Sequence, residues 1–143
     1  MVFDAFQYAV DLNRKKKLKT ITSPGLIAKD RELMADLCKS ANLNLLDEDL
    51  RTQASVIDTC LTWADYGIAD TGTLMLASDT EELRIATMLS KIHIAMLPMS
   101  KIKPDTAGIE KELDDILKKD KPSYTAFITG ASRTADIERV LAI

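Results

Sequence analysis

The chain has 143 residues, of which 46% are apolar and 29% are charged. This balance is typical of a soluble globular domain and excludes disordered, collagen-like and coiled-coil proteins. The formal net charge of -3 gives no broad electrostatic reason to bind nucleic acid or an anionic membrane surface.

The spacing of the cysteines indicates whether this chain binds a metal or cluster, and the N-terminal charges indicate its cellular compartment. Cys38 and Cys60 lie far apart and have no C-x-x-C spacing, so they form neither an iron–sulfur nor a zinc motif. We expect two buried or half-buried free thiols, which suit a reducing compartment. The N-terminal charges have the reverse order of a signal peptide, and no apolar run approaches the roughly 18 residues that span a bilayer. The sequence therefore predicts a cytoplasmic protein with no membrane contact and no cofactor in this chain.

The first third of the chain is predicted to be rich in helices. Apolar residues at helical spacing predict an amphipathic helix over residues 4–17. This helix would end in the basic run RKKKLK, residues 14–19, because positive charge suits a helix C-terminus. Residues 18–22 are predicted to form a short extended segment, and a second helix would begin at Asp30 as its N-cap. A third helix is predicted after residues 44–46, with four positions on one face: Leu50, Ala54, Ile57 and Leu61.

The remainder alternates short apolar runs with helical patterns. Residues 74–77 and 92–97 are typical of strands buried on both faces of a parallel sheet, and a capped helix is predicted between them. Another strand is predicted at residues 124–128. Two further helices are predicted from the apolar stripes Ile109, Leu113, Ile116 and Leu117, and Ile137, Val140 and Leu141. The sequence therefore predicts an α/β fold with a mainly parallel sheet flanked by helices and a helix-rich N-terminal third.

Two small polar loops at the boundaries of predicted strands are the candidate ligand-binding segments. The first comprises Ala69, Asp70, Thr71, Gly72 and Thr73, and the second comprises Gly130, Ala131, Ser132, Arg133 and Thr134. Strand ends and helix N-termini in α/β sheets favour anions, and Arg133 would add a bidentate partner for a carboxylate or a phosphate. In the alternative interpretation, the hydroxyls of the second loop only cap a helix.

Other candidate functional residues also have structural interpretations. Asp70 is a candidate general base or nucleophile, but its carboxylate could instead bond its own backbone in a turn. His93 lies in an apolar run and is interpreted as a satisfied core or edge histidine. Trp63 and Tyr66 are expected to anchor a short helical turn in the core. The chain has no P-loop, dinucleotide fingerprint, nucleophile elbow or metal-ligand cluster.

Three stretches together resemble the LUD domain, the domain of the lactate-utilisation protein C family. They are TWADYGIADTGTLML at residues 62–76, HIAMLP at residues 93–98 and ITGASRTADIE at residues 128–138. The resemblance covers the second half of the chain, whereas the first sixty residues match only loosely.

The resemblance implies a fold similar to that of ribose-phosphate isomerases, glucosamine-phosphate deaminases and CoA transferases. It also implies a role in the oxidation of L-lactate to pyruvate, beside partner proteins that carry iron–sulfur clusters. The small polar motifs of the family fall on Asp70, Thr71, Gly72, Thr73, Gly130, Ser132, Arg133, Thr134 and Asp136.

The chain departs from the family pattern at two places. Ala131 stands where the family commonly has proline, and the sequence stops at Ile143, where family members continue into a Gly-x-His-Gly-Pro segment. We therefore expect a single LUD-like domain over residues 1–143, truncated at its C-terminus. A sheet edge left unpaired would favour self-association into a homo-oligomer.

Three functions remain open at this point. The first is a component of lactate oxidation that binds a small carboxylate or phosphorylated ligand at the two loops. The second is a non-catalytic assembly subunit that docks an iron–sulfur partner. The third is a transferase or isomerase-like enzyme in which Asp70 is the catalytic base or nucleophile, by analogy with proteins of the same fold.

Overall fold

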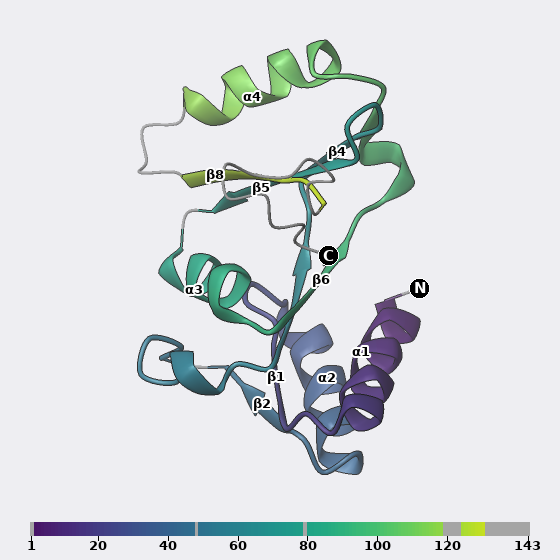
Figure 1. Ribbon diagram of the computed structural model, residues 1–143, viewed down its shortest axis with the longest axis vertical. Helices are drawn as coiled ribbons and strands as arrows, with labels where there is room; N and C mark the ends of the chain where they lie inside the picture. The colour runs from purple at the N-terminus through teal and green to yellow at the C-terminus, as the bar shows by residue number, and fades with distance from the viewer. Residues whose placement is uncertain (1, 48, 79, 119–123, 131–143) are drawn as a thin grey trace, which may run out of the picture. The chain divides into compact units, whose positions relative to one another are not determined.

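The computed structural model describes residues 2–47, 49–78, 80–118 and 124–130. The chain divides into two compact units, shown in Figure 1. Unit 1 comprises residues 1–63 and 80–96, and unit 2 comprises residues 64–79 and 97–143. Each unit contains a four-stranded sheet among its described residues.

Unit 1 is built on a parallel sheet, sheet A, with the strand order β2-β1-β3-β6. All three strand pairings in this sheet are parallel. Crossover connections therefore join successive strands of this sheet, as in α/β folds. The strands are β1 (Thr20–Thr22), β2 (Asn44–Leu46), β3 (Thr59–Trp63) and β6 (Ile92–Met96).

Helices cover both faces of sheet A because successive strand residues alternate between its faces. Ile21 and Leu61 point into one core cluster with residues of α1 and α2. Cys60 belongs to a second cluster, which also contains Ala86 of α3. The helices are α1 (Val2–Lys16), α2 (Ala28–Ser40) and α3 (Glu81–Leu89). The prediction of a mainly parallel sheet flanked by helices is thus confirmed.

The predicted third helix is wrong. Residues 44–46 form β2, Ala54–Val56 form only a short 3-10 helix, η1, and Leu61 lies in β3. Leu50, Ile57 and Leu61 are nevertheless buried, as the pattern required. Apolar residues at helical spacing also arise when an irregular segment leads into a strand buried on both faces, so the pattern identified burial but not conformation.

Two local predictions in unit 1 and at the start of unit 2 are also wrong. Helix α2 begins at Ala28, and its N-cap residue Ile27 makes no side-chain capping bond, so Asp30 is not the N-cap. Trp63 ends β3 with 42% of its surface exposed, and Tyr66 begins strand β4 (Tyr66–Ile68). The two aromatic residues therefore lie in strands rather than in a helical turn.

Unit 2 is built on sheet B, which has the strand order β7-β4-β5-β8. Strand β5 pairs antiparallel with both β4 and β8, whereas β4 pairs parallel with β7. The strands that join β4 in this sheet are β5 (Thr73–Ser78), β7 (Ile102–Lys103) and β8 (Tyr124–Ile128). The helical segments are η2 (Met99–Lys101), η3 (Ala107–Ile109) and α4 (Glu110–Leu117).

Helix α4 lies over sheet B, as Figure 1 shows. The core beneath it consists of Ile68, Met75 and Ile109, with Tyr66, Leu113 and Ile116 packed against them. The apolar stripe at positions 109, 113 and 116 therefore does face a core, as predicted. The predicted helix that contains Ile137, Val140 and Leu141 lies outside the described residues.

The strand–helix–strand unit predicted between residues 74 and 97 is only partly correct. Helix α3 forms there, and the Thr80 hydroxyl accepts a hydrogen bond from the Leu83 N–H as its N-cap. Strand β5, however, pairs in sheet B, whereas β6 pairs in sheet A. A continuous apolar run indicates a strand buried on both faces, but it carries no information about the direction of its neighbours.

No helix within the described ranges is both long enough and apolar enough to cross a membrane.

Candidate functional site

The first polar loop is the turn that joins β4 to β5. Gly72 has φ +63, a left-handed conformation that favours glycine over other residues. The Ala69 N–H donates to the Lys103 carbonyl at 2.9 Å, and the Asp70 N–H donates to the Pro104 carbonyl at 3.1 Å. These two bonds tie the start of the loop to the end of β7, so the loop has a defined position at one end of sheet B.

A chain of three hydroxyl groups connects this loop to the end of β8. Leu74 pairs with Ile128, which places Thr73 opposite Thr129 in the antiparallel register. The Thr73 Oγ1 is hydrogen-bonded to the Thr71 Oγ1 at 2.8 Å and to the Thr129 Oγ1 at 3.2 Å. In this series of three hydroxyls the central residue, Thr73, is buried, whereas the two outer residues, Thr71 and Thr129, are exposed. The first loop is therefore next to Thr129, the residue that precedes Gly130.

The hydroxyl chain has one O–H donor that its internal hydrogen bonds do not use. Each hydroxyl carries one proton, so two bonds among three hydroxyls leave one O–H that can donate to another group. Both exposed ends of the chain adjoin glycine, and a Cβ added at Gly72 or Gly130 would meet no atom within 4 Å. An anionic oxygen could approach the backbone closely at either end.

The predicted site residues fall into two groups. Asp70, Thr71, Gly72, Thr73 and Gly130 lie at the same end of sheet B. Ser132, Arg133, Thr134 and Asp136 lie outside the described residues. The structure adds Thr129, which was not among the predicted site residues because its partner is 56 residues away. Two signals for it were its position directly after a predicted strand and its place in the motif at residues 128–138.

A lysine on the same face of sheet B is already engaged. Ile68 pairs with both Thr73 and Lys103, so these two residues flank it on neighbouring strands. The Lys103 ammonium lies 2.6 Å from the Glu112 carboxylate and 5.8 Å from the centre of the Tyr66 ring. The hydrogen bond to Glu112 raises the pKa of Lys103 and lowers the pKa of Glu112. Lys103 is thus a fixed cation whose charge is balanced by Glu112.

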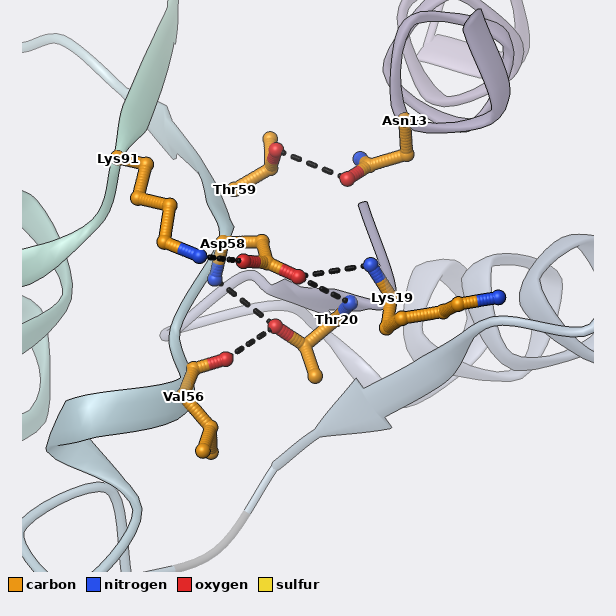
Figure 2. Close-up of polar contacts among 7 residues, drawn as sticks. All are labelled: Asn13, Lys19, Thr20, Val56, Asp58, Thr59 and Lys91. Carbon is orange, nitrogen blue, oxygen red and sulfur yellow. Dashed lines mark hydrogen bonds and ion pairs between the residues drawn. The ribbon is translucent and has the colours of Figure 1, made fainter. Parts of the chain in front are cut away.

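Unit 1 contains a second polar cluster, centred on Asp58 (Figure 2). One carboxylate oxygen of Asp58 accepts from the Lys19 N–H at 2.7 Å and from the Thr20 N–H at 3.1 Å. The other oxygen pairs with the Lys91 ammonium at 2.7 Å. The Asp58 N–H donates to the Thr20 hydroxyl at 2.8 Å, and this hydroxyl donates to the Val56 carbonyl.

The Asp58 cluster is structural rather than catalytic. Burial alone raises the pKa of Asp58, but the hydrogen bonds from Lys91, Lys19 and Thr20 outweigh burial and hold the pKa below its ordinary value. The cluster precedes β3 and β6 and includes the start of β1. It therefore lies at the amino ends of the strands, opposite to the edge where α/β sheets bind ligands.

The histidine and the cysteines match their plain interpretations. His93 lies in β6, at the edge of sheet A, and its Nε2 is 2.7 Å from the hydroxyl of Thr62 in β3. Burial lowers the pKa of His93. Cys38 and Cys60 are free and buried, and burial raises their pKa to about 11 and about 12. We therefore expect both thiols to stay protonated at neutral pH and to react slowly. The described segments hold no group of three or more His, Cys, Asp or Glu side chains suited to a metal ion.

The pattern of the LUD domain matches residues 5–143 of this sequence. The chain belongs to the LUD domain family. It is 34% identical over 98 residues to lactate utilization protein C of Halalkalibacterium halodurans, a match that covers 67% of this LUD domain and 43% of the relative. The protein of the same name from Anoxybacillus flavithermus is 34% identical over 83 residues, which cover 58% of this chain and 36% of the relative.

The LUD domain described here spans less than half the length of these curated relatives. Its fold is similar to that of a DUF162 family protein from Deinococcus radiodurans, with a TM-score of 0.56 and 16% identity. That similarity covers 85% of this chain and 72% of the other chain. The structural neighbour supports the α/β fold of this LUD domain.

Proposed function

We propose that this LUD domain takes part in lactate utilisation in the cytoplasm and binds a small anion such as lactate or pyruvate at Thr71, Thr73 and Thr129. Support for the pathway comes from the relatives named lactate utilization protein C. Support for the location of the ligand comes from one observation, the hydroxyl chain that joins the β4–β5 turn to the end of β8.

A carboxylate is the natural ligand for this arrangement. The chain of hydroxyls has one O–H in excess, and a carboxylate oxygen is an acceptor that forms short, strong bonds with such donors. The glycines beside both exposed hydroxyls leave space for a ligand next to the backbone. In the proposed site, Arg133 and Ser132 of the second loop complete the binding of the carboxylate.

The proposed reaction context needs an electron acceptor. Conversion of lactate to pyruvate breaks the C–H and O–H bonds of the carbinol and releases two electrons and two protons. We propose that iron–sulfur partner proteins accept the electrons, and that this domain contributes to binding or assembly. This partner follows from the family resemblance and is testable separately from ligand binding.

Isothermal titration calorimetry tests the ligand proposal directly. The wild-type chain is titrated with lactate, pyruvate and a sugar phosphate, and we expect heat of binding with one of the carboxylates. Thr73→Val keeps the branched shape that suits a strand but removes the central hydroxyl, so it should abolish or greatly weaken that heat.

Thr125→Val is the matched control for this experiment. Thr125 lies in the same sheet on β8, and its buried hydroxyl has no partner among the described residues. The control should bind the ligand as the wild type does. Absence of heat with all three ligands, or an equal loss in both variants, would rule out a binding site at this hydroxyl chain.

A further inference from the structure

The end of α1 and the connection to β1 carry a concentration of positive charge. Five cations lie within six consecutive residues, all with exposed side chains, and we call them the basic corner: Arg14, Lys15, Lys16, Lys17 and Lys19. They are five of the 19 cations of a chain that has 22 acidic residues. The corner is therefore a local positive surface on a protein that is negative elsewhere.

The charges of the basic corner are not balanced by ion pairs within the described ranges. Other cations of the structure do have carboxylate partners, namely Arg31, Arg51, Lys91, Lys103 and Lys118. Lys19 comes closest to a carboxylate, but only its backbone N–H bonds to Asp58. Figure 2 shows its side chain pointing away from that carboxylate.

Lys17 has a left-handed backbone conformation that is unfavourable for a residue with a Cβ. The Leu18 N–H donates to the Asn13 carbonyl at 2.9 Å, and the Lys17 N–H donates to the Arg14 carbonyl at 3.2 Å. These two bonds form a Schellman motif, in which Lys17 is the first residue after the helix and has φ +58. Glycine or asparagine is favoured there, and α2 ends in the same way with Asn42 at φ +55.

Stabilisation of the helix explains only part of the basic corner. Cations in the last turn, such as Arg14 and Lys16, interact favourably with the C-terminal end of the helix dipole. Lys17 and Lys19 lie beyond the last residue of α1, and Lys17 has a strained conformation. Their positive charge therefore needs a second explanation, outside the folding of unit 1.

We propose that the basic corner docks an acidic surface patch of a partner protein. Electrostatic complementarity of this kind steers association and sets orientation. A nucleic acid fits less well, because the run contains no aromatic side chain for base stacking. An extended nucleic acid or a membrane would also lie against the rest of the protein, whose net negative charge repels it. A small acidic patch would contact the basic corner alone.

Fluorescence anisotropy with a labelled poly-glutamate peptide tests this proposal at low salt. The test variant combines Lys15→Gln, Lys17→Asn and Lys19→Gln, and it keeps a residue that tolerates the left-handed conformation. Because each exposed charge pair contributes modestly, loss of three should weaken peptide binding about tenfold. Circular dichroism and thermal unfolding establish that the variant is folded.

The matched control removes the same number of exposed positive charges elsewhere, through Lys29→Gln, Arg84→Gln and Lys111→Gln. It should change the affinity by less than about twofold if the corner is the docking site. Equal weakening in both variants would mean that only net charge matters and would overturn the proposal. Tighter binding to duplex DNA or to phosphatidylserine vesicles than to the peptide, lost in the test variant alone, would also overturn it.

Discussion

At the scale of single residues, Asp58 shows how one carboxylate can organise the amino end of a parallel sheet. Its two oxygens accept from the backbone before and within β1 and from Lys91, which precedes β6. The side chain of Asp58 is 10% exposed, whereas that of Lys91 is 63% exposed. The buried hydrogen bonds from the backbone should therefore matter more than the ion pair.

We expect Asp58→Asn to destabilise the protein by about 2 kcal/mol, because charge-assisted hydrogen bonds to buried backbone N–H groups are lost. Lys91→Gln is the matched control and should cost less than about 1 kcal/mol, because water screens the exposed ammonium. Urea denaturation at neutral pH measures both changes. A larger loss with Lys91→Gln than with Asp58→Asn would contradict this order.

The same residue predicts a dependence of stability on pH. The pKa of Asp58 is lower in the folded chain than its ordinary value of 3.8. The unfolded chain therefore binds this proton more readily, so the stabilisation is present above pH 3.8 and is lost as the pH falls through the folded pKa. The difference in stability between wild type and Asp58→Asn should shrink below pH 3.8. A difference that stays constant down to pH 2 would contradict this linkage.

Lys17 offers the opposite case, a residue whose replacement should stabilise the fold. A left-handed conformation costs a residue with a Cβ about 1 kcal/mol relative to glycine, so Lys17→Gly should raise the free energy of unfolding by about that amount. Asn42→Gly, at the equivalent position of α2, should have a smaller effect because asparagine tolerates this conformation. Thermal and urea unfolding of both variants test the prediction, and destabilisation by Lys17→Gly would disprove it.

At the scale of elements, sheet B depends on close packing between β4 and the segment that follows β6. Gly67 is buried in β4, and a Cβ at this position would lie 2.5 Å from a terminal methyl group of Leu97. A side chain at Gly67 would therefore displace the end of the Leu97 side chain, whereas the backbone conformation at Gly67 is open to other residues. This contact could not be read from the sequence, because Leu97 is 30 positions away.

We expect Gly67→Ala to destabilise the protein by about 1 kcal/mol, because the Leu97 side chain must move to make room for the added Cβ. In a Leu97→Val background the same substitution should cost less, because the clashing methyl group is removed. A double-mutant cycle measured by urea denaturation gives this coupling. Gly130→Ala, where the added Cβ meets nothing within 4 Å, should change stability by less than about 0.5 kcal/mol. Strict additivity of the two substitutions would argue against the contact.

At the scale of the whole molecule, the two cysteines report on the stability of unit 1. Cys38 lies in the core between sheet A and helices α1 and α2, and Cys60 lies in the core on the α3 side. Both are at most 1% exposed. A thiol reagent can therefore reach them only when unit 1 opens on one face or the other.

We expect both thiols to react slowly in the native protein and rapidly in urea. Leu61→Ala leaves a cavity at a fully buried position and should destabilise unit 1 by about 2–5 kcal/mol, which accelerates labelling of both cysteines. Val56→Ala, at a position that is 49% exposed, is the control and should leave the labelling rate nearly unchanged. Rapid labelling of the native wild type would show that the cores are more accessible than this structure implies.

Many buried positions, the turn at Gly72 and the family of the chain could be predicted from the sequence, although Trp63, expected in the core, is 42% exposed. The apolar stripe of α4, the buried positions Leu50 and Leu61 and the turn at Gly72 could all be predicted, because periodicity and glycine content are local properties. The LUD domain motifs were also readable, because each is continuous in sequence.

The pairing of these parts, in contrast, became visible in the folded structure. It assigned β5 and β6 to different sheets, set Thr73 beside Thr129 and brought Asp58 to the start of β1, 38 residues away in sequence. A local pattern reports whether a side chain is buried, but not which distant strand covers it or in which direction that strand runs. For this reason the candidate loops were found from sequence, whereas the hydroxyl chain that connects the first loop to Thr129 was found only from the strand register.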